Sequence, residues 1–287
     1  MMALPHLAKS WLSVGIVLWM FSIAAGAEQR PIDVIEDNSF LIEEAYNQEP
    51  NVIQHIFTAA YNNDSRQRGW TFNFTQEWPV FSQDHQFSYS VPTYHFIDGA
   101  DRIYGLGDVL INYRYQALYG DDSKPAFAPR FSLILPTGSR RRDTGNNVVG
   151  YQWNLPFSKK LGPQFAAHAN FGLTYLPQVR ALLDAGTGQL SPKHSLVSYN
   201  VGASGIYALY PRFHLMLEWL GNFEESINDA GKRVRAFKPT LSPGFRAAVI
   251  NEEKLQVVMG AAMPVGLSHK ADNHGAFLYL SIEHELF

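Results

Sequence analysis

The sequence predicts an all-β protein: a closed antiparallel transmembrane β-barrel of about twelve strands, with a short N-terminal periplasmic segment. Three observations favour this fold class. Apolar and polar residues alternate with a two-residue period, long and short connections follow one another, and the polar positions carry mostly small uncharged residues. Beyond the amino terminus, the chain has no apolar run long enough for a transmembrane helix.

Residues 1–27 have the pattern of a signal peptide. Lys9 precedes an apolar run from Trp11 to Ala25, and small residues follow up to Ala27. We expect cleavage after Ala27 and export of the mature chain. The alternative is an N-terminal membrane anchor, for which the apolar run is short.

Residues 28–51 form an acidic segment, with seven acidic residues and one arginine. Ser39 stands where it would cap a short helix through Tyr46. We expect this segment to lie in the periplasm or to tuck into the inner mouth of the barrel. A plain solvated leader is the alternative.

The barrel is expected to occupy residues 52–287. In the stretch VGYQWNLPFSKK (149–160), large apolar residues such as Tyr151, Trp153 and Phe157 share one face of a strand, and polar residues share the other. Similar segments recur along the chain. They predict strands at 52–62, 69–81, 85–97, 104–118, 127–137, 148–160, 164–177, 195–209, 213–224, 235–250, 254–267 and 275–287.

The connections distinguish a membrane barrel from a soluble sandwich. Tight turns are expected at 82–84, 161–163, 210–212 and 251–254, and longer polar loops between them, with 119–126 as the exception on the short side. Outer-membrane barrels sort their loops in this way. The polar face carries few of the Lys and Glu residues that a sandwich would expose, so the aromatic face is expected to contact lipid.

Composition excludes several functional classes. The net charge of -3 offers no basic surface for nucleic acid, and the absence of cysteine excludes thiol catalysis, disulfides and cysteine-bound zinc. The histidines show no metal-ligand spacing such as H-E-x-x-H, so no metal site and no cofactor are predicted. His194 and Ser195 are adjacent on a strand and point to opposite faces, so we expect no enzyme.

Charged residues at inward positions are candidates for pore-lining groups. Projection onto the strands groups Arg114, Arg130, Lys160 and Arg246 into a basic wall, and Glu77, Glu283 and Glu285 into an acidic wall. Asp108 and Glu218 are inward as well. Two interpretations remain open: a field across an aqueous lumen that favours anions, or charges that pair with each other or with Glu43 and Glu44 and fill the bore.

Arg140, Arg141 and Arg142 fall on a predicted outer loop. They favour contact with the phosphates of lipopolysaccharide, and capture of an anionic solute is the alternative. Outer-membrane lipid, lipopolysaccharide and a small-molecule solute are thus the expected partners, and the sequence makes no prediction about oligomeric state.

Two glycine-containing motifs carry a family resemblance. GLGDVLINYRY (105–115), followed by RFSLILPTGS (130–139), resembles the family of outer-membrane transporters named for the MetA pathway of phenol degradation, over residues 104–287. The resemblance implies a channel for aromatic or other hydrophobic small molecules and no particular binding residues. One departure concerns the terminal Phe287, because the alternate positions before it are Glu285, Glu283 and Ser281.

The expected function is therefore a passive outer-membrane channel of a Gram-negative bacterium that carries small molecules. The alternative is a non-conducting barrel with a structural or surface-interaction role.

Overall fold

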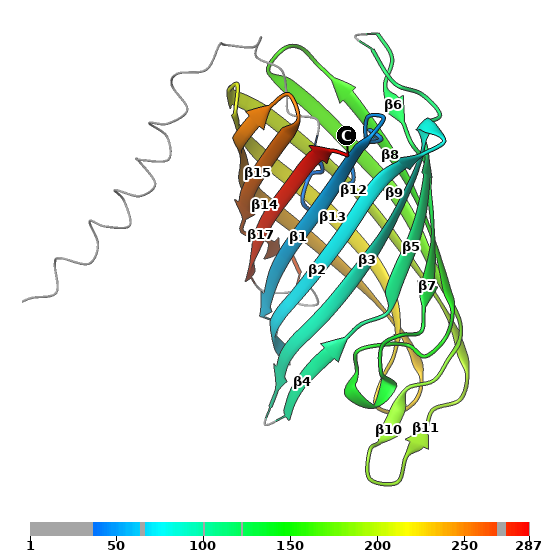
Figure 1. Ribbon diagram of the computed structural model, residues 1–287. Helices are drawn as coiled ribbons and strands as arrows, with labels where there is room; N and C mark the ends of the chain where they lie inside the picture. Colours follow the sequence, from blue (N-terminus) through cyan, green and yellow to red (C-terminus); the bar gives the residue numbers. More distant parts are fainter. Residues whose placement is uncertain (1–36, 64–66, 100, 122, 269–273, 287) are drawn as a thin grey trace, which may run out of the picture.

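The computed structural model describes residues 37–63, 67–99, 101–121, 123–268 and 274–286. They form a closed antiparallel barrel whose wall consists of twelve membrane-crossing strands (Figure 1). The signal peptide expected at 1–27 lies outside the described residues, as does the start of the acidic segment. No helix within the described part of the chain is long and apolar enough to cross a membrane.

The wall follows the sequence order of the strands. Its elements are β1 (Val52–Asn63), β2 (Gln67–Val80), β3 (Ser82–Asp98), β4 (Asp101–Leu106), β5 (Val109–Tyr115), β6 (Ala126–Phe127), β7 (Arg130–Leu135), β8 (Gly150–Lys160), β9 (Phe165–Val179), β12 (His194–Tyr210), β13 (Phe213–Ile227), β14 (Arg233–Glu252), β15 (Leu255–Ala262), β16 (Val265–Gly266) and β17 (His274–Glu285). β4 and β5 together count as one of the twelve strands, because they follow each other along the same side of β3. β1 closes the barrel by pairing with β17 from Val52↔Glu285 to Asn63↔His274.

The alternation of faces is confirmed. Trp153, Phe171 and Leu217 are 43%, 49% and 53% exposed on the outer surface, where a membrane barrel contacts lipid. The residues between them, such as Asn154 and Glu218, are buried inside the barrel. The inner and outer positions are therefore those that the two-residue period predicts.

The loops are sorted by end, as expected. The turns after β2, β8, β12 and β14 lie at the end where β1 begins, and the connection from 116 to 129 lies there too. The opposite end carries the loop from 136 to 149, with a short 3-10 helix η2 (Arg140–Arg142), and a hairpin of β10 (Leu182–Asp184) and β11 (Gln189–Leu190). Figure 1 shows this hairpin at the end away from the marked C-terminus. The hairpin lies within a connection for which the sequence predicts no strand.

The strand predicted at 104–118 is broken between β4 and β5. Gly107 donates its backbone N–H to Pro92 O at 2.8 Å, and a Cβ at Gly107 would lie 2.6 Å from Tyr94 Cε2. A larger residue here would displace the side chains of Tyr94 and Pro92, so glycine suits this close approach. The break places Asp108 at the head of β5, where its buried carboxylate binds the loop from 136 to 149.

Candidate functional site in the barrel bore

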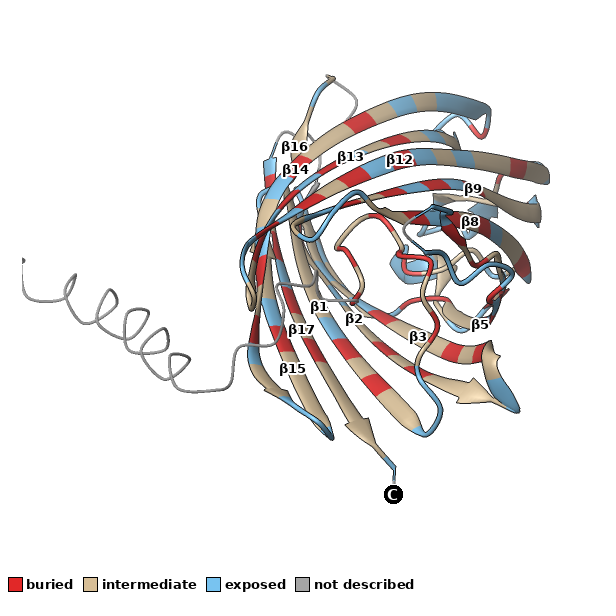
Figure 2. Cartoon of the chain, turned by 90° about the horizontal axis from the view of Figure 1, so that it is seen from above, coloured by how far each residue is buried: buried red, intermediate tan, exposed pale blue. Residues whose placement is uncertain are grey.

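Residues 37–51, which we call the inner segment, lie inside the barrel. Ile42 and Ala45 are 1% and 0% exposed, and Figure 2 shows chain within the ring of strands. The helix expected from Ser39 through Tyr46 does not form, because side chains of the wall take the backbone N–H groups that a helix needs. Of the two expected places for the acidic segment, its described part occupies the bore.

The wall holds the backbone of the inner segment along much of its length. Glu218 Oε1 on β13 accepts three consecutive N–H groups, from Phe40 at 3.1 Å, Leu41 at 2.9 Å and Ile42 at 3.1 Å. The N–H groups that follow are accepted by side chains of β9, β8, the end of β5, and β3. These acceptors are Asn170 for Glu43, Ser158 for Ala45, Gln116 for Asn47 and Gln86 for Gln48, at 2.7 to 2.8 Å.

Ion pairs add a second set of contacts. Glu43 lies between two arginines of the wall, 3.2 Å from Arg114 Nη1 and 2.9 Å from Arg130 Nε. Glu44 Oε1 lies 2.9 Å from Arg246 Nη1 on the other side of the bore. The arginines are thus neutralised by the inner segment, so the interpretation of paired charges that fill the bore describes this structure.

Electrostatics favour the ionised form of Glu43, which does not belong to a membrane-crossing strand. Burial acts to raise the pKa of the Glu43 carboxyl, but Arg130 and Arg114 outweigh burial and lower it below its ordinary value of 4.5. Asn154 Nδ2 also donates to Glu43 Oε2 at 2.6 Å. The carboxylate is therefore charged and bound at neutral pH.

Apolar contacts anchor the first part of the inner segment. The ring of Phe40 lies 5.2 Å from that of Phe277 and 5.3 Å from that of Tyr279, both inward residues of β17. A Cβ at Gly260 would lie 2.4 Å from Phe40 Cζ, and one at Gly202 would lie 2.3 Å from the side chain of Ile42. Glycines in the wall thus leave room for these two anchors.

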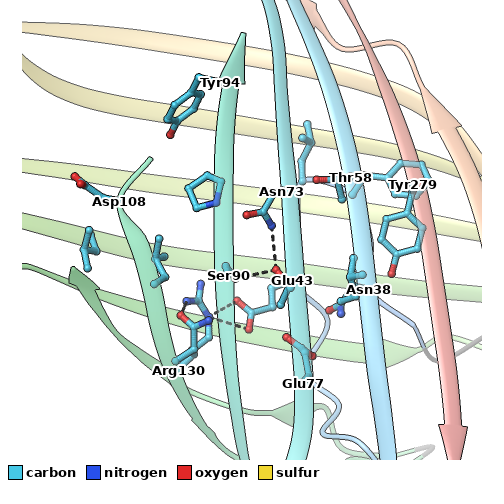
Figure 3. Close-up of a pocket in the computed structure, with 18 of the residues that line it drawn as sticks. Asn38, Glu43, Thr58, Asn73, Glu77, Ser90, Tyr94, Asp108, Arg130 and Tyr279 are labelled. Atoms are coloured by element: carbon cyan, nitrogen blue, oxygen red, sulfur yellow. Dashed lines mark hydrogen bonds and ion pairs between the residues drawn. The ribbon is translucent and has the colours of Figure 1, made fainter. Parts of the chain in front are cut away.

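Two cavities flank the inner segment. The outer cavity, about 640 Å³, is floored by residues 38–43 and bordered on its outer side by residues 143–146 (Figure 3). The cavity at the end where β1 begins is about 240 Å³ and is lined by Asp37, residues 46–49 and the β14–β15 turn. The inner segment therefore separates two spaces of one bore.

The loop bordering the outer cavity is fixed by Asp108. Its Oδ1 accepts the N–H of Gly138 at 3.0 Å, and its Oδ2 accepts the N–H of Asn146 at 2.8 Å. Thr144 of this loop is buried. Asp108 thus lines the outer cavity and also folds the loop over it.

Each of the remaining charged candidates has its own partner or register position. Glu77 Oε2 is 3.9 Å from Arg114 and accepts from Gln86 at 2.7 Å. Glu283 accepts from Gln48 at 3.5 Å, and Glu285 pairs with Lys254 at 3.3 Å. Lys160 ends β8 opposite Ala166 of β9.

The prediction that the basic residues form a single wall of the bore is wrong. Arg114 and Arg130 are register partners on β5 and β7, as expected, but Arg246 lies on β14. The strand order places the acidic residues of β2 and β17 between β5 and β14 on one side, and Glu218 of β13 beside β14 on the other. The projection grouped Arg246 with the other basic residues by its height along the barrel alone, whereas its strand lies across the ring.

Sequence reasoning missed the neutral side chains that hold the inner segment, such as Asn170, Ser158 and Gln86. One signal existed: Phe277 and Tyr279 occupy inward positions of the last strand, where a water-filled lumen gives an aromatic ring no partner. Their partner is Phe40. Inward aromatics thus indicate something apolar in the bore.

One buried arrangement resembles hydrolase chemistry. Ser158 Oγ lies 2.7 Å from His168 Nδ1, and His168 Nε2 lies 3.8 Å from Glu44. Ser158 is 1% exposed, lines neither cavity, and accepts the N–H of Ala45. The burial of this hydroxyl and its bond to the inner segment support a structural role. Among the described residues, no cluster of three His, Asp or Glu side chains is placed to hold a metal.

Comparison with solved structures places the fold among outer-membrane barrels. The COG4313 outer membrane channel from Pseudomonas putida F1 superposes with a TM-score of 0.67 at 13% identity, over 84% of this chain and 97% of that one. The NanC porin (TM-score 0.49, 9% identity, 81% and 100% coverage) and the KdgM porin (0.45, 8%, 82% and 99%) are more distant. No family model and no curated protein sequence matches the chain.

Proposed function

We propose that this protein is a passive channel for small molecules in the outer membrane of a Gram-negative bacterium, and that this structure is its closed state. The observation that carries the proposal is the inner segment. It separates two cavities of one bore, and it is held there by hydrogen bonds, ion pairs and ring contacts of side chains. A closure of this kind can be released without opening the barrel wall.

The candidate pore-lining residues border the path proposed for the solute. Glu77, Asp108 and Arg130 line the outer cavity, and Glu283 and Glu285 line the inner one. Arg114, Lys160, Glu218 and Arg246 lie on the wall of the same bore. Once the inner segment leaves, a solute would pass these groups in turn.

The proposed solutes include aromatic and other hydrophobic small molecules, as the family resemblance implies. The lining of the outer cavity supports this choice, because it combines apolar side chains such as Leu41, Leu110 and Ile134 with polar ones such as Asn73 and Ser90. Ligand sites for small organic molecules commonly have this mixture.

Lipopolysaccharide is the proposed partner at the outer end. Arg141 and Arg142 are exposed there on the loop between β7 and β8. Arginine binds phosphate with paired N–H groups, so these side chains suit lipid phosphates.

Conductance in planar bilayers tests the channel. We expect few openings of the intact protein, and steady conductance of a variant that lacks residues 37–49 but keeps its heat-sensitive migration on denaturing gels. The filled bore also favours the alternative, a non-conducting barrel with a structural or surface role. That alternative holds if the shortened variant is folded and does not conduct.

A further inference from the structure

Two arginines stand directly opposite each other on neighbouring strands of the bore. Arg114 and Arg130 are register partners, and like charges in such positions repel unless an anion lies between them. The anion is Glu43, at 3.2 Å and 2.9 Å. It belongs to the inner segment, whereas Glu77 of the wall comes only within 3.9 Å of Arg114. The wall thus supplies the cations, and a separable segment supplies the carboxylate.

The groups around Glu43 suit a carboxylate of any source. Asn154 Nδ2 on β8 donates to Glu43 Oε2 at 2.6 Å. Arg130 is oriented from the wall, because its Nη1 donates to Asn112 at 3.1 Å and its Nη2 to Gln152 at 3.3 Å. The Asn112 and Gln152 contacts do not involve the inner segment, so Arg130 keeps its orientation when the Glu43 carboxylate is absent. Arg114 is held by the rest of the inner segment, because its Nε donates to Asn47 Oδ1 at 2.8 Å and its Nη2 to Tyr46 O at 2.5 Å.

The site is reachable from the outer end. The side chains of Glu43 and Arg130 are 17% and 18% exposed and line the outer cavity (Figure 3). The side chain of Arg114 is 3% exposed and does not line this cavity. A cavity of about 640 Å³ accommodates a small organic molecule. A solute carboxylate that enters this cavity therefore meets Arg130 first.

We propose that Arg114, Arg130 and Asn154 form a binding site for the carboxylate of a small organic acid, which Glu43 occupies in the closed state as an internal substitute. The two carboxylates exclude each other, so binding of the acid weakens the hold on the inner segment. Binding itself does not depend on conduction. Only the step from binding to opening rests on the proposed function.

Rescue by an external carboxylate tests the site. Glu43→Ala empties it, and acetate is the probe, with equal concentrations of chloride and of neutral acetamide as references. At about five times its dissociation constant, acetate should raise the unfolding temperature of this variant by about 2–4 °C relative to both references. If Glu43→Ala does not fold, Glu43→Gln, which keeps the shape of the side chain, takes its place.

Glu44→Ala is the matched control. It removes the neighbouring carboxylate from Arg246, which is fully buried and lines neither cavity, so acetate should not stabilise it. The proposal is overturned if acetate stabilises Glu43→Ala no more than chloride does. It is also overturned if acetate stabilises Glu44→Ala equally, or if the acetate effect survives the added change Arg130→Ala.

Release of the inner segment is measured separately in the otherwise unchanged protein. The chain has no cysteine, so Ala45→Cys supplies a single thiol at a position that is 0% exposed. Acetate should raise its labelling rate severalfold over chloride. If acetate stabilises Glu43→Ala but does not speed the labelling of Ala45→Cys, the binding site is supported and its coupling to opening is refuted. That result is distinct from a failure to conduct.

Discussion

Replacement of Glu218 by alanine should release the inner segment while the barrel stays closed. One oxygen of this carboxylate accepts the N–H groups of Phe40, Leu41 and Ile42, at 3.1, 2.9 and 3.1 Å. A hydrogen bond stabilises by roughly 0.5–1.5 kcal/mol, and by up to about 3 kcal/mol when the acceptor is ionised. The variant also removes the cost of burying the carboxylate, several kcal/mol, which offsets part of the loss.

The net effect is expected to be about 2–4 kcal/mol, which is a rise of roughly 30- to 1000-fold in the population of the released segment. The assay is the labelling rate of Ala45→Cys by a small thiol reagent, compared with and without Glu218→Ala. A folded barrel is verified by different migration of heated and unheated samples on a denaturing gel.

Glu225→Ala is the control on the same strand. Glu225 accepts from Arg235 at 2.6 Å and from the N–H of Val197 at 2.9 Å, at the outer end of β13 and away from the inner segment. It should leave the labelling rate unchanged. Equal rates for Glu218→Ala and the parent protein, with the barrel folded, would refute the role assigned to Glu218.

Three further predictions concern packing, lipid contact and pH. Gly260→Val places a side chain against Phe40, because a Cβ there lies 2.4 Å from Phe40 Cζ; it should speed the same thiol labelling, and an unchanged rate would refute the anchor. Leu217→Arg puts a charge on the outer face and should lower the free energy of unfolding by about 2–4 kcal/mol in urea titrations in lipid; full tolerance would refute the assignment of faces. Since the pKa of Glu43 is lowered from 4.5, its contribution to stability is present above pH 4.5 and is lost as pH falls through the lower folded value. The parent should therefore be more stable than Glu43→Gln at pH 7, and a thermal difference that persists unchanged at the lowest pH would contradict this.

The strands were predictable because lipid and bore impose opposite demands on alternate residues. Trp153 and Phe171 could be assigned to the outer face from sequence alone, because in each of their strands the large apolar residues occupy alternate positions. The break at Gly107 was not predictable, because it depends on a contact with Pro92 of another strand. The local residue pattern therefore determines where the strands lie, whereas breaks within a strand depend on contacts with neighbouring strands.

The site was predictable only in part. The pairing of Arg114 with Arg130 follows from their equal distance to the turn, and Glu43 could be named as a partner because the acidic segment lies next to β1 in sequence. The helix expected from Ser39 was wrong because the acceptors of its N–H groups come from distant strands, Glu218 among them. The position of Arg246 across the bore required the closed ring.

Closure by the inner segment can be tested within a single molecule. A cysteine pair, Ile42→Cys with Gly202→Cys, joins two positions in direct contact, because a Cβ at Gly202 would lie 2.3 Å from Cδ1 of Ile42. Formation of the disulfide is verified by loss of both free thiols before recording. It is introduced together with Glu218→Ala, so that only the disulfide retains the segment. Single-channel conductance should be absent under oxidising conditions and should appear in the same bilayer after reduction. Equal conductance before and after reduction would contradict the account.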